Sequence, residues 1–120
     1  MGNFNETQIN RAWNEATTVN QDSKDTWRKD PCGAWINRGQ YGKETEYGWE
    51  IDHAYPAAKG GTDHSDNLRA MHWKNNRSKG DDYPGYTSSV TSDGNKNVNK
   101  TQSLKVSDST QARLKQLYNI

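Results

Sequence analysis

One stretch of the chain carries most of the side chains that could do chemistry. It opens with Trp-Glu-Ile-Asp-His at residues 49–53 and contains Lys-Gly-Gly at 59–61 and Asp-Asn-Leu at 66–68. It closes with Lys-Asn-Asn-Arg-Ser-Lys at residues 74–79. Its ligand atoms are mostly oxygens, from Asp52 and the asparagines. Hard oxygen ligands favour magnesium or manganese, whereas zinc would need more histidine or cysteine.

A metal ion and a base together suffice to hydrolyse a phosphodiester bond. His53 stands next to Asp52, and histidine is the side chain that ordinarily titrates near neutral pH. We expect one divalent ion, held by one carboxylate and one amide, with open positions for water and a phosphate oxygen. The base would remove a proton from water while the metal stabilises the developing charge. Arg77 and Lys79 share a predicted helix and are expected to hold the phosphate backbone.

The order of these residues resembles the core of the HNH endonucleases, the ββα-metal fold. The family signature has an Asp-His or His-His pair at the end of a first strand, a Gly-Gly loop, an Asn-Leu at the start of a second strand, and an Asn or His followed by a Lys on a short helix. The matching elements here are Asp52-His53 with Pro56 after it, the loop over 59–63, Asn67-Leu68, and the helix carrying 76–81. The resemblance covers roughly residues 28–82.

The resemblance implies a role for each matching residue. Asp52 and Asn76 would be the metal ligands, and His53 would be the general base. Asn67 would fix the loop and orient His53 through backbone hydrogen bonds, as outer-shell groups do around metal sites. Because successive residues of a strand point to opposite faces, Asp52 and His53 reach one site only if the strand bends or ends at this pair.

Several neighbouring residues have a plainer alternative. Glu50 could support the site, although a solvated or salt-bridged glutamate is the simpler interpretation. His72 is expected to be packed rather than a ligand, with an auxiliary role at the site as the alternative. Asn76 could instead cap a helix, and Lys79 could simply suit the negative end of a helix dipole.

Many relatives hold a structural zinc with two Cys-x-x-Cys pairs, and this chain departs from that pattern. The second pair would fall at His72 and Asn75, and the first would fall near Cys32, the only cysteine. Without a fourth ligand these residues make no sound zinc site, so we expect no structural zinc. Three tryptophans are expected to pack in its place: Trp35, Trp49 and Trp73.

The elements that must position the site follow from the periodicity of the centre. Residues 47–53 alternate large apolar with polar side chains, which predicts a half-buried strand. A long connection over 54–67, a second strand over 68–73 and a helix over 74–79 follow. Gly80 is expected to end that helix. The centre should therefore run strand, loop, strand, helix.

The N-terminal flank is predicted to hold a short helix within residues 1–20. Asn5 can cap this helix, with Gln8 three residues on as in a capping box. Residues 20–34 are polar and are expected to be mostly loop, followed by a short strand at 34–36.

The C-terminal flank allows two interpretations. Residues 83–108 are rich in Ser, Thr, Asn and Gly, which is typical of edge strands or of a loosely ordered polar arm. Residues 109–120 are expected to form a C-terminal helix that Ser109 caps. The predicted fold is therefore one α+β domain over 1–120, with a small ββα-metal core at 28–82 and a helix on each flank.

The composition limits the kinds of binding partner to expect. The 120 residues include 16 basic and 15 acidic side chains, for a net charge of +1. A near-neutral chain would bind DNA through a local patch, so a homodimer or a protein partner is an alternative source of affinity. The sequence shows neither a membrane span nor a signal peptide, so we expect a cytoplasmic protein, with delivery as an effector toxin left open.

The expected function is a metal-dependent endonuclease that hydrolyses DNA, with double-stranded DNA as the expected partner. The alternative is a non-catalytic module that binds nucleic acid or a protein partner on the same fold.

Overall fold

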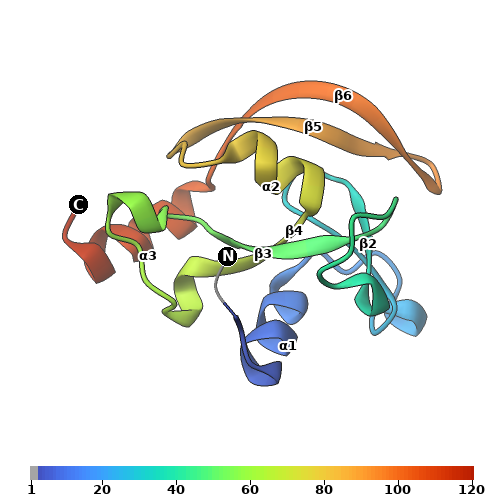
Figure 1. Ribbon diagram of the computed structural model, residues 1–120, viewed down its shortest axis with the longest axis horizontal. Coiled ribbons are helices and arrows are strands. Elements are labelled where there is room, and N and C mark those ends of the chain that lie inside the picture. The colour runs from blue at the N-terminus through green and yellow to red at the C-terminus, as the bar shows by residue number, and fades with distance from the viewer. Residues whose placement is uncertain (1–2) are drawn as a thin grey trace.

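The computed structural model describes residues 3–120, which form an α+β domain with three α-helices and three small antiparallel sheets (Figure 1). Each sheet is a pair of strands: β1 with β2, β3 with β4, and β5 with β6. The helices are α1 (Glu6–Glu15), α2 (Trp73–Lys79) and α3 (Asp108–Tyr118). The strands are β1 (Trp27–Lys29), β2 (Trp35–Asn37), β3 (Trp49–His53), β4 (Leu68–His72), β5 (Gly85–Asp93) and β6 (Lys96–Lys105). Among the described residues, no helix has the length and apolar character needed to cross a membrane.

The central elements run strand, loop, strand, helix, as the periodicity predicted. β3 pairs with β4 in a register that sets Asp52 opposite Arg69, and β4 leads directly into α2. The helix begins one residue earlier than predicted, because His72 caps it by accepting a hydrogen bond from the Lys74 N–H. Gly80 ends it, as predicted.

β3 is more deeply buried than its alternating pattern predicted, since Trp49, Glu50, Ile51 and Asp52 are all buried. On one face, Trp49 and Ile51 join the apolar core that α1 covers. On the other face, Glu50 and Asp52 contact side chains of α2. A helix on each face removes the solvent-exposed side that alternation implies, so the polar residues of β3 are held between layers.

The N-terminal helix forms with its predicted capping box. The Asn5 side chain accepts a hydrogen bond from the Gln8 N–H, and the Gln8 side chain accepts one from the Asn5 N–H. The buried face of α1 packs against the β3–β4 pair through Ile9, Ala12 and Trp13.

The segment over residues 20–34 is mostly turn and loop, as predicted, but it also holds a short strand. It contains β1, which pairs with β2 so that Arg28 stands opposite Ile36. β1 is only three residues long, which is too short to show a period. The buried Arg28 side chain donates to three carbonyl groups at the end of α1 and in the following turn, so this strand is anchored by a polar residue rather than an apolar one.

Residues 83–108 form ordered strands rather than a loose arm. β5 and β6 make a long hairpin that turns at Gly94-Asn95 and arches over α2 (Figure 1). Tyr86 and Val90 of β5 are buried. The hairpin therefore covers the face of α2 that the β3–β4 pair does not.

The C-terminal helix α3 forms as predicted, but Ser107 caps it instead of Ser109. Leu114 is buried in a second apolar cluster with Met71 and Tyr86. Near the end of the helix, Tyr118 stacks on Tyr55 at a ring-centroid distance of 5.4 Å. This contact places the end of α3 on the connection between β3 and β4.

Candidate active site

A hollow of about 450 Å³ lies beside β3 and collects four of the eight predicted site residues. Its walls include Asp52 and His53 from the end of β3 and Asn76 from α2. Glu50, predicted as a supporting residue, also lines it. β3 ends at His53, so Asp52 and His53 border one hollow although strand alternation alone would separate them.

Asp52 is 3% exposed and contacts two cations. Arg69, opposite it on β4, donates from Nε to Oδ2 at 2.9 Å. The Lys79 ammonium lies 3.3 Å from Oδ1. Burial lowers the pKa of Lys79, and the Asp52 carboxylate acts against that shift. The carboxylate predicted to bind a metal is therefore already the centre of a buried ion-pair cluster.

Lys79 is turned inward, which corrects the predicted phosphate contact. Its side chain is 0% exposed, and its ammonium group also donates to the His53 carbonyl at 3.2 Å. Arg77, on the same helix, is exposed and pairs with Glu44 and Glu50. Of the two cations predicted to hold the nucleic-acid backbone, only Arg77 faces solvent.

His53 is held by a carboxylate that sequence reasoning did not assign to the site. Its Nε2 lies 2.7 Å from Oδ1 of Asp63, in the connection between β3 and β4. A histidine that donates from Nε2 keeps Nδ1 as its basic nitrogen. The only sequence signal for Asp63 was its place after the Gly-Gly pair, which gives no contact by itself.

Asn67 fixes the connection rather than touching the His53 side chain. It is fully buried, and its Oδ1 accepts from the Tyr55 N–H at 2.6 Å. Its Nδ2 donates to the carbonyls of Tyr55 and Thr62 at 3.0 and 2.9 Å. A Cβ on Gly61 would come within 1.8 Å of the Tyr55 carbonyl oxygen, so this tight turn requires glycine. Asn67 is thus a positioning residue, as the resemblance implied.

Asn76 contacts the site through its amide nitrogen. Nδ2 donates to Oε1 of Glu50 at 3.1 Å, which leaves the amide oxygen free to act as a ligand. Asn76 does not cap α2, because His72 does. Glu50 is paired with Arg77 at 3.5 Å and so is salt-bridged, the simpler of its two interpretations.

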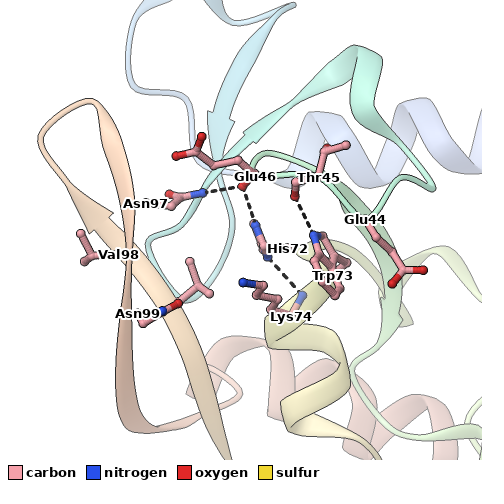
Figure 2. Close-up of a pocket in the computed structure, with 10 residues that line it drawn as sticks. Glu44, Thr45, Glu46, His72, Trp73, Lys74, Asn97, Val98 and Asn99 are labelled. Carbon is pink, nitrogen blue, oxygen red and sulfur yellow. Dashed lines mark hydrogen bonds between the residues drawn. The ribbon is translucent and has the colours of Figure 1, made fainter.

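His72 is packed, as expected, and faces a different hollow (Figure 2). Its Nε2 donates to the Glu46 carbonyl at 2.7 Å, and Nδ1 accepts from the Lys74 N–H at 3.1 Å. Figure 2 shows the His72 ring between the loop that carries Glu46 and the start of α2, with β6 across from it. Burial lowers the pKa of His72, so its neutral form is favoured. It is not placed for an auxiliary role beside His53.

A buried carboxylate, Asp30, contacts Cys32, His72 and Asn75, the residues at which the resemblance would place a structural zinc. Its Oδ1 accepts from the backbone N–H groups of Cys32 and Ala34, and its Oδ2 accepts from the His72 N–H and the Asn75 side chain, all at 2.9–3.0 Å. The donors do not fit zinc, because burial raises the pKa of the Cys32 thiol to about 12 and both ring nitrogens of His72 are in hydrogen bonds.

The three tryptophans expected in place of zinc are spread over the molecule. Trp49 lies in the core under α1, whereas Trp35 and Trp73 are only partly buried. Trp35 donates from its indole to the Gly94 carbonyl at the tip of the β5–β6 hairpin. Of the three, Trp73 does pack beside the predicted zinc position, because it stacks on His72 at a ring-centroid distance of 6.0 Å. The Asp30 hydrogen-bond network, rather than a tryptophan cluster, joins Cys32, His72 and Asn75.

Comparisons with protein-family models, with curated proteins and with solved structures found no significant match to this chain. The resemblance to HNH endonucleases therefore depends on the motif residues and on where the fold puts them.

Proposed function

We propose that the protein is a metal-dependent endonuclease of the HNH type that hydrolyses phosphodiester bonds of double-stranded DNA, with His53 as the general base. One observation carries the proposal: Asp52, His53 and Asn76, from the two ends of the β3–β4–α2 unit, line one hollow. A base, a carboxylate and an amide at one hollow are the groups that the proposed chemistry needs.

The oxygen donors suit a hard divalent ion such as magnesium or manganese. Asp52 and the Asn76 amide oxygen would hold it, with water and a phosphate oxygen completing its shell. Among residues 3–120, no three His, Cys, Asp or Glu side chains gather tightly enough to bind a metal by themselves. A carboxylate has about four lone-pair sites, of which Arg69 and Lys79 occupy two on Asp52, so binding there competes with two cations. A bound ion would stabilise charge on the phosphate and on the leaving oxygen.

The pairing of His53 with Asp63 supports the assignment of the base. A carboxylate on Nε2 fixes the ring tautomer and stabilises the imidazolium that forms when Nδ1 takes a proton from water. Lys79 holds the backbone of the same residue through the His53 carbonyl. The base is therefore oriented from its ring and from its main chain.

The test is a plasmid-nicking assay with magnesium, with manganese and with EDTA. The wild type should convert supercoiled DNA to its nicked form. His53→Ala should lower the rate of this conversion about 10²–10⁴-fold, the usual contribution of a positioned base. His64→Ala is the matched control, because His64 is exposed in the same connection and does not line the hollow. Cleavage that survives EDTA, or that falls equally in both variants, contradicts the proposal.

The same assay distinguishes the proposed endonuclease from the alternative, a non-catalytic binding module. That module would bind DNA or a protein partner without metal, and it would keep this binding in His53→Ala. Metal-dependent cutting that His53→Ala abolishes rules it out.

A further inference from the structure

A second hollow, of about 370 Å³, carries an excess of positive charge. It lies between α1, the start of β4, the end of β6 and α3. Its charged lining residues are the cations Arg11, Arg69, Lys105 and Arg113 and the carboxylates Glu15 and Asp66. We call this hollow the basic cleft. The chain as a whole is almost neutral, and the lining has four cations against two carboxylates. Lys105 and Arg69 are also paired with Asp108 and Asp52, which do not line the cleft, so Arg11 and Arg113 are the cations that remain for a ligand.

The floor of the basic cleft contains a buried donor without a partner. Nη2 of Arg69 is buried and has no hydrogen-bond partner among residues 3–120. The Arg69 side chain is 15% exposed, and its Nε is already engaged by Asp52. Buried donors are nearly always satisfied, so this nitrogen, which lies in a guanidinium packed on the Tyr86 ring, is an exception within the cluster.

The cluster behind Arg69 is also short of negative charge. Asp52 is one carboxylate facing two cations, Arg69 and Lys79. The neighbouring groups do not compensate, because burial raises the pKa values of Cys32 and Tyr86 to about 12 and both stay neutral at pH 7. An anion in the basic cleft would supply the missing charge.

The ligand that suits this lining has several phosphates. The exposed cations come from three separate elements, Arg11 on α1, Lys105 on β6 and Arg113 on α3, so one small anion would not engage them all. Planar guanidinium groups bind phosphate oxygens in pairs. The exposed large apolar residues Val19, Val98, Leu117 and Ile120 lie outside the cleft, so it lacks the apolar contacts of a membrane-binding surface.

We propose that the basic cleft binds backbone phosphates of nucleic acid, at a site separate from the hollow beside β3. The choice of nucleic acid as the source of the phosphates rests on the proposed function. Arg69 connects the two sites, because its side chain lines the cleft while its Nε bonds to Asp52.

The test measures binding of a short fluorescent DNA duplex in EDTA, where no metal-dependent cleavage occurs, over a series of salt concentrations. Arg11→Gln and Arg113→Gln should each weaken binding and lower the slope of log affinity against log salt by about 0.9, the value for one lost phosphate contact. The double variant should lose about twice that slope. Both arginines are exposed, so folding should be unaffected, which circular dichroism checks.

Lys100→Gln and Lys115→Gln are the matched controls, since both lysines are exposed and lie outside the basic cleft. Cleft variants that bind DNA no worse than these controls overturn the proposal. So does competition in which inorganic phosphate displaces DNA at equal phosphate concentration, or binding of the cleft to anionic lipid vesicles in place of DNA.

The outcome is distinct from that of the nicking assay. Loss of DNA binding in the cleft variants supports the cleft even if the wild type cuts nothing. Cutting by a wild type whose cleft variants bind like the controls supports the proposed function and rejects the cleft.

Discussion

At the scale of single residues, the contact between His53 and Asp63 most directly links the structure to chemistry. A general base needs one ring nitrogen held and the other left basic, and the 2.7 Å contact at Nε2 provides this. Asp63 is itself 58% exposed, so its contribution to stability is small and its contribution to ring orientation can be measured separately.

We therefore predict that Asp63→Asn lowers kcat for cleavage about 10–100-fold, as loss of an orienting partner does. KM and thermal stability should change little, because the residue is exposed and does not line the hollow. Asp93→Asn, at an exposed carboxylate that lines neither the hollow beside β3 nor the basic cleft, serves as the control. Equal kcat values for Asp63→Asn and wild type would reject the orienting role.

The buried ion-pair cluster makes a second prediction at this scale. Asp52→Ala leaves Arg69 and Lys79 without their carboxylate and should cost about 3–5 kcal/mol of unfolding free energy. Lys79→Met should cost much less, because Asp52 and Arg69 still balance each other and an apolar chain fills the buried space. Urea unfolding of both variants measures the difference. If Lys79→Met proved as costly as Asp52→Ala, the cluster would not carry the excess positive charge inferred for it.

At the scale of elements, the Asp30 network connects the β1–β2 turn with β4 and α2. One carboxylate satisfies four N–H donors, and Asn75 passes the connection to β5 by donating to the Val90 carbonyl and accepting from its N–H. Hydrogen bonds thus join elements that a zinc ion joins in many HNH endonucleases, the family that this chain resembles.

Asp30→Ala should destabilise the fold by about 2 kcal/mol or more, because buried N–H donors lose their acceptor. Thermal or urea unfolding checks this, with Asp93→Ala at an exposed carboxylate as the control. A loss no larger than that of the control would show that the network does not hold these elements together.

The cap of α2 predicts a pH dependence. Burial lowers the pKa of His72 below its ordinary value of 6.5, so the unfolded chain takes up a proton at a higher pH than the folded one. The stability that the neutral ring contributes is complete above 6.5 and is lost as pH falls through the folded pKa.

His72→Asn keeps a capping oxygen and removes the titration. Its unfolding free energy should therefore fall less than that of the wild type between neutral and mildly acidic pH. Parallel pH profiles of unfolding free energy for the two proteins would contradict the assignment of this pH dependence to His72.

At the scale of the whole molecule, local patterns predicted the central elements, whereas the hollow that Asp52, His53 and Asn76 line also takes residues from the N-terminal segment and from the loop before β3. The residue pattern around Asp52-His53, Asn67 and Asn76 was sufficient to predict a strand, a loop, a second strand and a helix. Each of these elements has its own hydrophobic period or a residue that ends it. Contacts between distant residues were not predictable in this way. No local period indicates that Lys79 turns inward to Asp52, or that Asp30 meets Asn75.

The same limit applies to the flanks. The polar composition of β5 and β6 did not decide between strands and a loose arm, because few of their side chains are apolar and the burial of Tyr86 and Val90 depends on distant parts of the fold. The basic cleft could not be predicted from the sequence for a similar reason, because its cations come from segments far apart in the chain.

The central claim is that Asp52 and Asn76 hold a divalent ion beside His53. The most direct test is an anomalous difference map from crystals soaked in manganese. We predict one strong peak within coordination distance of the Asp52 carboxylate and the Asn76 amide oxygen, absent in Asn76→Ala. A peak elsewhere on the molecule, or none in the presence of bound DNA, would contradict it.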